Sequence, residues 1–131
     1  MRFIMPFVIF FMATPSFSDW VPIVTSTSGA EFFVDDKTIF NTNKSLHVQM
    51  LTNYSLKQDT GEISSVSDTI IKCNKFLIKD TRLKTFSKKF ARGRQLSDHD
   101  LVAYGIDIWT TAEKGSTYFL FLTRLCAELG R

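Results

Sequence analysis

The two cysteines, Cys73 and Cys126, are the residues that most restrict how this chain of 131 residues can fold. They lie 53 residues apart. In an exported chain, two cysteines favour one disulfide over a metal site or a reactive thiol. A disulfide that closes a loop of this length contributes about 4 kcal/mol in the chain-entropy model. This is a large share of the roughly 5–15 kcal/mol that stabilises a small domain.

The first 18 residues have the pattern of a secretory signal peptide. Arg2 supplies positive charge, residues 3–12 are almost entirely apolar, and residues 13–18 form a more polar region that ends in a small residue. An uncleaved membrane anchor is the alternative, but the apolar run is shorter than the roughly 20 residues that cross a bilayer. No cysteine lies near the expected cleavage site, so lipid attachment is not expected there. The sequence predicts a signal peptide at 1–18 and one mature domain at 19–131, with no integral membrane segment after cleavage.

Positive charge is concentrated in one segment, residues 72–94, which we call the basic arm. It contains nine Lys or Arg residues and a single acid, Asp80, for a net charge of +8, whereas the whole chain carries +3. Such a patch favours acidic partners, for example acidic segments of a glycoprotein, sulfated glycans or anionic lipid headgroups. The alternative is a solvated hairpin whose lysines protect a sheet edge from aggregation. The candidate ligand-binding residues of the basic arm are Lys75, Lys79, Arg82, Lys84, Lys88, Lys89, Arg92 and Arg94.

Most of the mature chain has β-strand character. Short runs rich in β-branched and aromatic residues are separated by Gly, Asn, Asp and Ser turn signals. Residues 46–56 alternate between two sets of side chains, which is the period of a half-buried strand. A hairpin is expected within the basic arm, with its turn at Lys79 and Asp80. The predicted strands are 20–24, 30–34, 38–40, 46–56, 63–78, 82–90 and 102–109, and residues 95–101 are expected to form a polar loop.

The C-terminal tail, residues 115–129, is ambiguous by composition. Its aromatic residues favour a strand, but Ser116 is a good helix N-cap. An apolar stripe at helical spacing is formed by Phe119, Leu122, Cys126 and Leu129. We expect a terminal helix that is docked by this stripe and held by Cys126. Trp20 and Trp109 are expected in the core, because large rings dominate burial in a small domain.

No catalytic signature or cofactor motif occurs in the sequence. Asp98, His99 and Asp100 carry potential metal ligands, but a single loop histidine between acids is more often solvated. The other histidine, His47, is distant in sequence. Two histidines without a nucleophile motif do not indicate a catalytic triad, and a disulfide would occupy both cysteines. No nucleic-acid-binding motif is present either. We therefore expect a chain that is not an enzyme and that needs no metal or cofactor.

A set of landmarks spans nearly all of the mature chain, in the order Trp20, Phe33-Val34-Asp35, Cys73 in a basic strand, Gly93, Trp109, Gly115-Ser116 and Cys126. Their order resembles the surface-adhesin protein E family of exported Gram-negative proteins. The resemblance implies an α+β fold, with a curved antiparallel sheet of about six strands. It also implies a C-terminal helix that packs on the concave face of this sheet and is tethered by a Cys73–Cys126 disulfide. In function it implies binding to host matrix and serum glycoproteins such as vitronectin and laminin.

One departure from the family concerns location. The adhesin that gives the family its name is an outer-membrane lipoprotein, whereas this chain lacks a cysteine at its expected cleavage site. The first hypothesis is an exported binding protein that uses the basic arm to hold host glycoproteins or other acidic macromolecules. The alternative is a periplasmic structural or envelope-associated protein with no host ligand. The expected location is the periplasm or the medium, with association at the cell surface under the first hypothesis.

Overall fold

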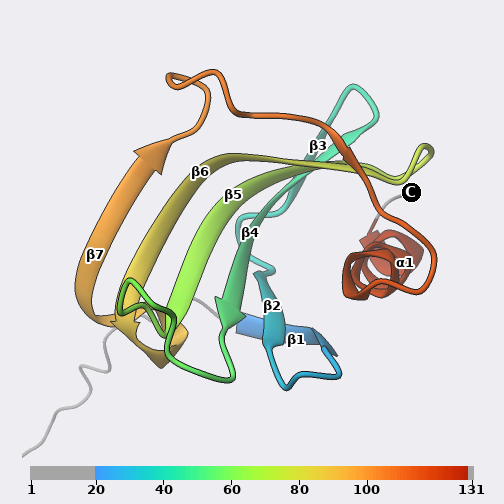
Figure 1. Cartoon of the computed structure of the whole chain (residues 1–131). Coiled ribbons are helices and arrows are strands. Elements are labelled where there is room, and N and C mark those ends of the chain that lie inside the picture. The colour runs from blue at the N-terminus through green and yellow to red at the C-terminus, as the bar shows by residue number, and fades with distance from the viewer. Residues whose placement is uncertain (1–19, 130–131) are drawn as a thin grey trace, which may run out of the picture.

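The computed structural model describes residues 20–129, so the predicted signal peptide lies outside the described residues. These residues form an open antiparallel sheet and a C-terminal helix, α1 (Thr117–Leu129) (Figure 1). Six strands follow one another in the order β1-β2-β4-β5-β6-β7, while β3 pairs with β4 and β8 with β6. The strands are β1 (Trp20–Thr25), β2 (Glu31–Asp35), β3 (Phe40–Thr42), β4 (Ser45–Asn53), β5 (Ser64–Lys72), β6 (Leu77–Lys88), β7 (Arg92–Asp100) and β8 (Thr110–Thr111), and a 3-10 turn, η1 (Lys89–Ala91), joins β6 to β7.

The sheet is curved, and α1 lies on its concave side (Figure 1). Strands β5, β6 and β7 are bent, and the segment between β7 and α1 runs from the outer strand across to the helix (Figure 1). Irregular pairing accompanies the bend. The register shifts once between β5 and β6, at Asp68 and Thr69, and twice between β6 and β7. Because bulges bend and twist a strand locally, they help to shape this curvature. The predicted α+β fold, with a curved antiparallel sheet and a terminal helix on one face, is confirmed.

The main core lies between the concave face and α1. The helix contributes Phe121, Leu122 and Leu125, whose side chains are all but fully buried. Burial of side chains of this size stabilises the fold by about 1.5–3 kcal/mol each. The sheet contributes the apolar residues Val24, Val34, Leu46, Val48, Met50, Ile71 and Ile78. The predicted alternation of β4 is therefore confirmed for the face that carries Leu46, Val48 and Met50.

A second, smaller core covers part of the convex face. Phe33, Leu51 and Val66 are buried there, and Trp20 and Phe90 pack against them. Leu51 lies on the same face of β4 as the polar residues His47 and Gln49, but the 3-10 turn η1 packs against this end of the sheet and buries it. As a result, residues on both faces of the sheet are buried near the end of β4. This second core supports the turn between β6 and β7.

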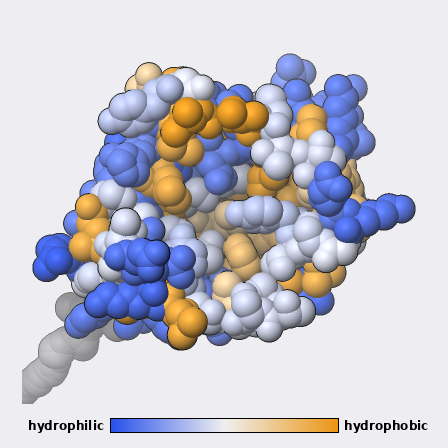
Figure 2. Space-filling model, viewed as in Figure 1, coloured by the Kyte–Doolittle hydropathy of each residue, from blue (hydrophilic) through white to orange (hydrophobic). Residues whose placement is uncertain are grey.

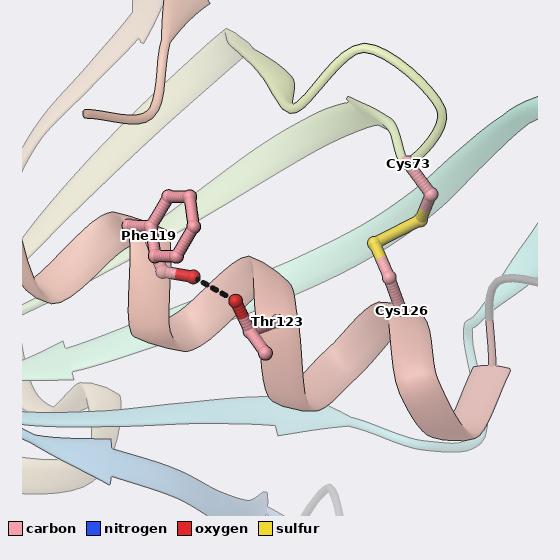
Figure 3. The surroundings of a disulfide bond; sticks show 4 residues. All are labelled: Cys73, Phe119, Thr123 and Cys126. Atoms are coloured by element: carbon pink, nitrogen blue, oxygen red, sulfur yellow. Dashed lines mark hydrogen bonds between the residues drawn. A yellow bond between two sulfur atoms is a disulfide. The ribbon is translucent and has the colours of Figure 1, made fainter. Parts of the chain in front are cut away.

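A disulfide joins the sheet to the helix (Figure 3). Cys73, the residue after β5, is bonded to Cys126 of α1, with the two Cα atoms 5.7 Å apart. The Phe76 ring in the same turn packs against Phe119 of α1, with ring centroids 5.0 Å apart. At the N-terminus of α1, the backbone N–H of Phe119 donates a hydrogen bond to Oγ of Ser116 over 3.1 Å. The predicted disulfide and the predicted N-cap are both confirmed.

Four local predictions are wrong. The turn expected at Lys79 and Asp80 falls at residues 73–76, so β6 begins earlier. Of the expected loop at 95–101, residues 95–100 belong to β7, because pairing with β6 overrides their weak strand propensity. Residues 102–109 form turns and irregular chain rather than a strand. Trp109 is half-buried and lies beneath Lys72 and Lys79 instead of in the core.

Candidate binding surfaces

The basic arm is spread along the full length of β6. Since this strand has 12 residues, its ends are about 36 Å apart at roughly 3.3 Å per residue. Lys75 lies in the turn before β6, whereas Lys88 is the last residue of β6 and Lys89 opens η1. The eight candidate ligand-binding residues therefore do not form one patch. They divide into three groups along the strand, with different partners in each.

The first group, Lys75 and Lys79, lies near Cys73 at the start of β6. Nζ of Lys79 is 3.6 Å from Oδ2 of Asp107 and 4.6 Å from the centroid of the Trp109 ring. Nζ of Lys72 lies 4.8 Å from the same ring. Cation–π contacts of this kind hold an ammonium group in place over an aromatic face. Lys79 is thus engaged in holding the segment that follows β7, while Lys75 is exposed in the turn.

The second group faces acids on β7. The Arg82 guanidinium donates two hydrogen bonds to the Asp98 carboxylate, of 2.8 and 3.0 Å. These bonds, together with the charges of Arg82 and Lys84, hold the pKa of Asp98 below its usual value. Lys84 pairs in register with Asp98, and Arg82 with Asp100. Two cations and two acids therefore share the middle of the hairpin, and their charges cancel.

The third group is the most exposed of the three. Lys88, Lys89, Arg92 and Arg94 are all exposed, and they lie within seven residues around η1. We call residues 88–94 the basic tip. Within residues 20–129, no carboxylate forms an ion pair with Lys88, Lys89 or Arg94. The guanidinium of Arg92 lies 5.6 Å from the centroid of the Phe90 ring. Half of the candidate ligand-binding residues thus come together here.

Buried polar side chains fix the backbone of the basic tip. The N–H of Phe90 donates to Oδ1 of Asn53 over 2.9 Å, and the N–H of Ala91 donates to Oγ of Ser64 over 3.0 Å. The Ser64 hydroxyl in turn donates to the carbonyl of Lys88. Asn53 and Ser64 are 1% and 0% exposed. Neither residue could be identified from the sequence, since a polar side chain on a strand carries no sign of such a role.

The backbone of the basic tip is also strained. Phe90 and Ala91 have φ angles of 61° and 57°, a left-handed conformation that costs a residue with a side chain roughly 1–2 kcal/mol. The ring of Phe90 holds the turn by packing on Phe33, with centroids 5.3 Å apart. Gly93 follows with φ of 76°, and a Cβ there would overlap Oγ of Ser87 and lie 2.9 Å from Cγ of Lys88. Strained residues held by their surroundings often mark functional segments.

The histidines lie on separate strands. His47 of β4 stacks on Phe40, with ring centroids 4.6 Å apart, and its Nε2 is 2.7 Å from the Thr42 hydroxyl. His99 of β7 lies between Asp98, which is bound to Arg82, and Asp100, which accepts bonds from the N–H groups of residues 102 and 103. In the part of the chain that the structure describes, no three His, Cys, Asp or Glu side chains are placed to hold a metal ion. No helix within residues 20–129 has the length and apolar character needed to cross a membrane.

Open depressions lie on both faces of the sheet. One, of about 370 Å³, lies on the convex face beside Phe40, His47, Gln49 and Asp68. There the amide of Gln49 donates to the carboxylate of Asp68 over 3.1 Å, so its polar groups bond to each other. The second, of about 360 Å³, lies on the concave side beside Asp80 and Tyr118. Neither was anticipated from the sequence, because each is assembled from several strands.

Comparisons with known proteins agree on one fold. The family model described as surface-adhesin protein E matches residues 20–127. A comparison with curated protein sequences returns no match. A solved structure of Haemophilus influenzae protein E has a TM-score of 0.61 at 14% identity, over 91% of this chain and 93% of that one. Its crystal form II has a TM-score of 0.60 at 14% identity, over 95% and 99%. A crystal structure of protein E from non-typeable Haemophilus influenzae has a TM-score of 0.59 at 14% identity, over 94% and 85%.

Proposed function

The chain belongs to the surface-adhesin protein E family, and on that premise we propose that it is an exported, non-enzymatic binding protein that holds acidic macromolecules at the cell surface. The basic tip is the proposed contact. The observation that carries the proposal is that four exposed cations are mounted on a backbone fixed by Asn53 and Ser64. A fixed backbone loses less conformational entropy when it binds, so more of the interaction energy appears as affinity.

The chemistry of the basic tip suits sulfate and carboxylate groups. Arginine can donate two parallel hydrogen bonds to either anion, and lysine adds a mobile point charge. Host matrix and serum glycoproteins such as vitronectin and laminin, and sulfated glycans such as heparin, carry groups of this kind. Arg82 and Lys84 are expected to contribute less, because Asp98 and Asp100 already offset their charge. Lys79 is held by Asp107 and Trp109.

Solid-phase binding to vitronectin, laminin and heparin tests this proposal. The variant Lys88→Glu/Lys89→Glu reverses two charges at the basic tip, and Lys75→Glu/Lys114→Glu reverses two exposed charges elsewhere. We expect the first to lower the affinity by at least about tenfold at low salt, and the loss to shrink as added salt screens the charges. We expect the control to bind nearly as well as the unaltered protein. If both variants bind equally well, the basic tip is not the contact.

A second candidate function is a structural or envelope-associated role in the periplasm, with no host ligand. It is favoured by the position of Cys73, the first cysteine of the given sequence, which lies far from the expected cleavage site. Cell fractionation with protease treatment of intact cells separates the two proposals. An adhesin must be cleaved under these conditions, whereas a periplasmic protein is protected until the outer membrane is opened.

A further inference from the structure

The concave side of the sheet contains a pocket that the proposed adhesive function does not use. Its volume is about 360 Å³, and it lies between the start of β6, the segment after β7 and the start of α1. One wall is apolar and is formed by Leu101, Ile106 and Ile108. Figure 2 shows apolar atoms along the segment after β7, above a hollow in this face. Ile106 and Ile108 are 55% and 67% exposed, so the wall is open to a ligand.

Asp80 supplies the polar part of the pocket. It pairs in register with Thr69 on the face that carries α1, and its Oδ1 accepts a 2.8 Å hydrogen bond from the Thr69 hydroxyl. That hydroxyl also lies 3.0 Å from the hydroxyl of Ser67, so the polar groups behind Asp80 bond to one another. The carboxyl group is half-buried, and its burial raises its pKa.

No cation within residues 20–129 forms an ion pair with Asp80. The two basic neighbours on β6 are bound elsewhere, Lys79 to Asp107 and Arg82 to Asp98. A partly buried carboxylate without a counterion is costly, and a cation that reached it would recover much of that cost. Tyr118 lines the same pocket and presents an aromatic ring, which also attracts cations.

We propose that this pocket binds a linear aliphatic ammonium group, with the cation on the Asp80 carboxylate and the methylene chain against Leu101, Ile106 and Ile108. The side chain of lysine has this chemistry, with a flexible four-carbon stem and a compact charge. So does a free alkylamine. The site attracts charge of the opposite sign to that bound by the basic tip. It therefore goes beyond the proposed adhesive function and can fail or hold independently of it.

The proposal is tested by NMR titration of the mature protein at neutral pH with n-pentylamine and, as the uncharged match, 1-pentanol. For ligands of this size we expect affinities in the millimolar range. The ammonium should bind at least about tenfold more tightly than the alcohol, and the amide signals that shift should be those of residues around the pocket. Equal affinity for the two ligands, or shifts confined to other surfaces, overturns the proposal.

Two variants complete the test. Asp80→Asn keeps the shape of the side chain and the acceptor for Thr69 but removes the charge. The ratio of the affinities for n-pentylamine and 1-pentanol should therefore fall to about one. Ile106→Ser alters an exposed side chain. It should weaken the binding of both ligands but leave the ratio of their affinities unchanged. If Asp80→Asn retains the full preference, the cation is bound elsewhere and the proposal is wrong. Heparin binding by Asp80→Asn should be unchanged, which distinguishes this site from the basic tip.

The source of the ammonium group is identified with two further ligands. Nα-acetyl-lysine N-methylamide presents the side chain as it occurs in a protein, and cadaverine presents it as a free diamine. Tighter binding of the lysine derivative indicates a site for a lysine of a partner protein, and tighter binding of cadaverine indicates a site for free amines. If neither ligand binds in a manner that depends on Asp80, the proposal is overturned.

Discussion

The backbone N–H of Phe90 donates a 2.9 Å hydrogen bond to Oδ1 of Asn53, a side chain that is 1% exposed. Asn53 ends β4, 37 residues before Phe90, and so connects the middle of the sheet to the tip of the last hairpin. This bond fixes a residue in a left-handed conformation beside four exposed cations. The shape of the proposed contact surface therefore depends on a side chain that cannot touch a partner.

Replacement of Asn53 should affect binding without changing any charge. Asn53→Ala leaves the N–H of Phe90 without its partner, and we expect the free energy of unfolding to fall by about 1–3 kcal/mol. Affinity for heparin should fall as well, because the tip becomes mobile. Urea unfolding and solid-phase binding measure the two effects. The control Gln49→Ala removes another amide of β4, whose partner is Asp68, and should leave heparin affinity unchanged. An unaltered affinity for Asn53→Ala would show that the tip is fixed by other contacts.

Gly93 and Gly105 form a matched pair of backbone tests. Both have positive φ angles, 76° and 70°, but a Cβ at Gly93 would overlap Ser87, whereas a Cβ at Gly105 would meet nothing within 4 Å. Gly105→Ala should therefore cost only the backbone term, about 1 kcal/mol. Gly93→Ala should cost a further 1–3 kcal/mol, roughly, because the hairpin must shift to make room. Chemical denaturation of both variants measures the difference. Equal losses would contradict the close approach at Gly93.

The disulfide should account for a large part of the stability. Reduction, or the replacement Cys73→Ser/Cys126→Ser, opens a loop of 53 residues and should lower the free energy of unfolding by about 4 kcal/mol. The midpoint of thermal unfolding, followed with and without reductant, measures this loss. The double variant is the control, since reductant should have no further effect on it. A midpoint that does not change on reduction would show that core packing alone holds α1 on the sheet.

The contribution of Asp80 to the free energy of unfolding should be smaller at neutral pH than at acid pH. Its pKa in the folded protein is raised above the usual 3.8, first by burial, which the hydrogen bond from Thr69 partly opposes. Between 3.8 and the raised pKa the folded state binds more protons than the unfolded state, so this group's contribution to stability falls as pH rises through that window. Tyr118 is the titratable side chain that faces it from α1. Asp80→Asn should therefore be more stable than the unaltered protein at pH 7.

The comparison that checks this prediction is urea unfolding of both proteins across the pH range. The advantage of Asp80→Asn should disappear below the usual pKa of 3.8, where the carboxyl group is protonated in both states. A constant difference at all pH values would indicate a packing effect of the amide. A variant that is less stable at pH 7 would mean that the carboxylate is stabilised by its surroundings.

The parts of the fold that sequence predicted well are those determined by short-range patterns. The N-cap at Ser116 and the apolar stripe that contains Leu122 specify α1. The alternation through Val48 specifies one face of β4. The turn before β6 was missed because Phe76 has a φ of 51° in a position where the sequence offers no glycine. Strand β7 was missed because its residues become a strand only through pairing with β6.

The candidate site also combines features that short-range sequence patterns determine with features that depend on strand pairing. The number of cations could be counted in the sequence, but their distribution could not. Asp98 neutralises Arg82 from 16 residues away, within a segment that local propensity assigned to a loop. Burial of Ser64 and its bond to the N–H of Ala91 arise from the arrangement of four segments around η1. Such contacts depend on register, which a single sequence does not determine.

The irregular pairing at the outer strands has a consequence for the behaviour of the protein in concentrated solution. An open sheet ends in two strands whose outward N–H and C=O groups can recruit further chains and start a fibril. Here β1 carries Pro22 and a shift of register beside it, and β7 is shifted twice and bears the charges of the basic tip. Neither border offers a long, straight row of backbone groups. The irregular pairing at both borders, together with these charges, thus disfavours the addition of neighbouring molecules to the sheet.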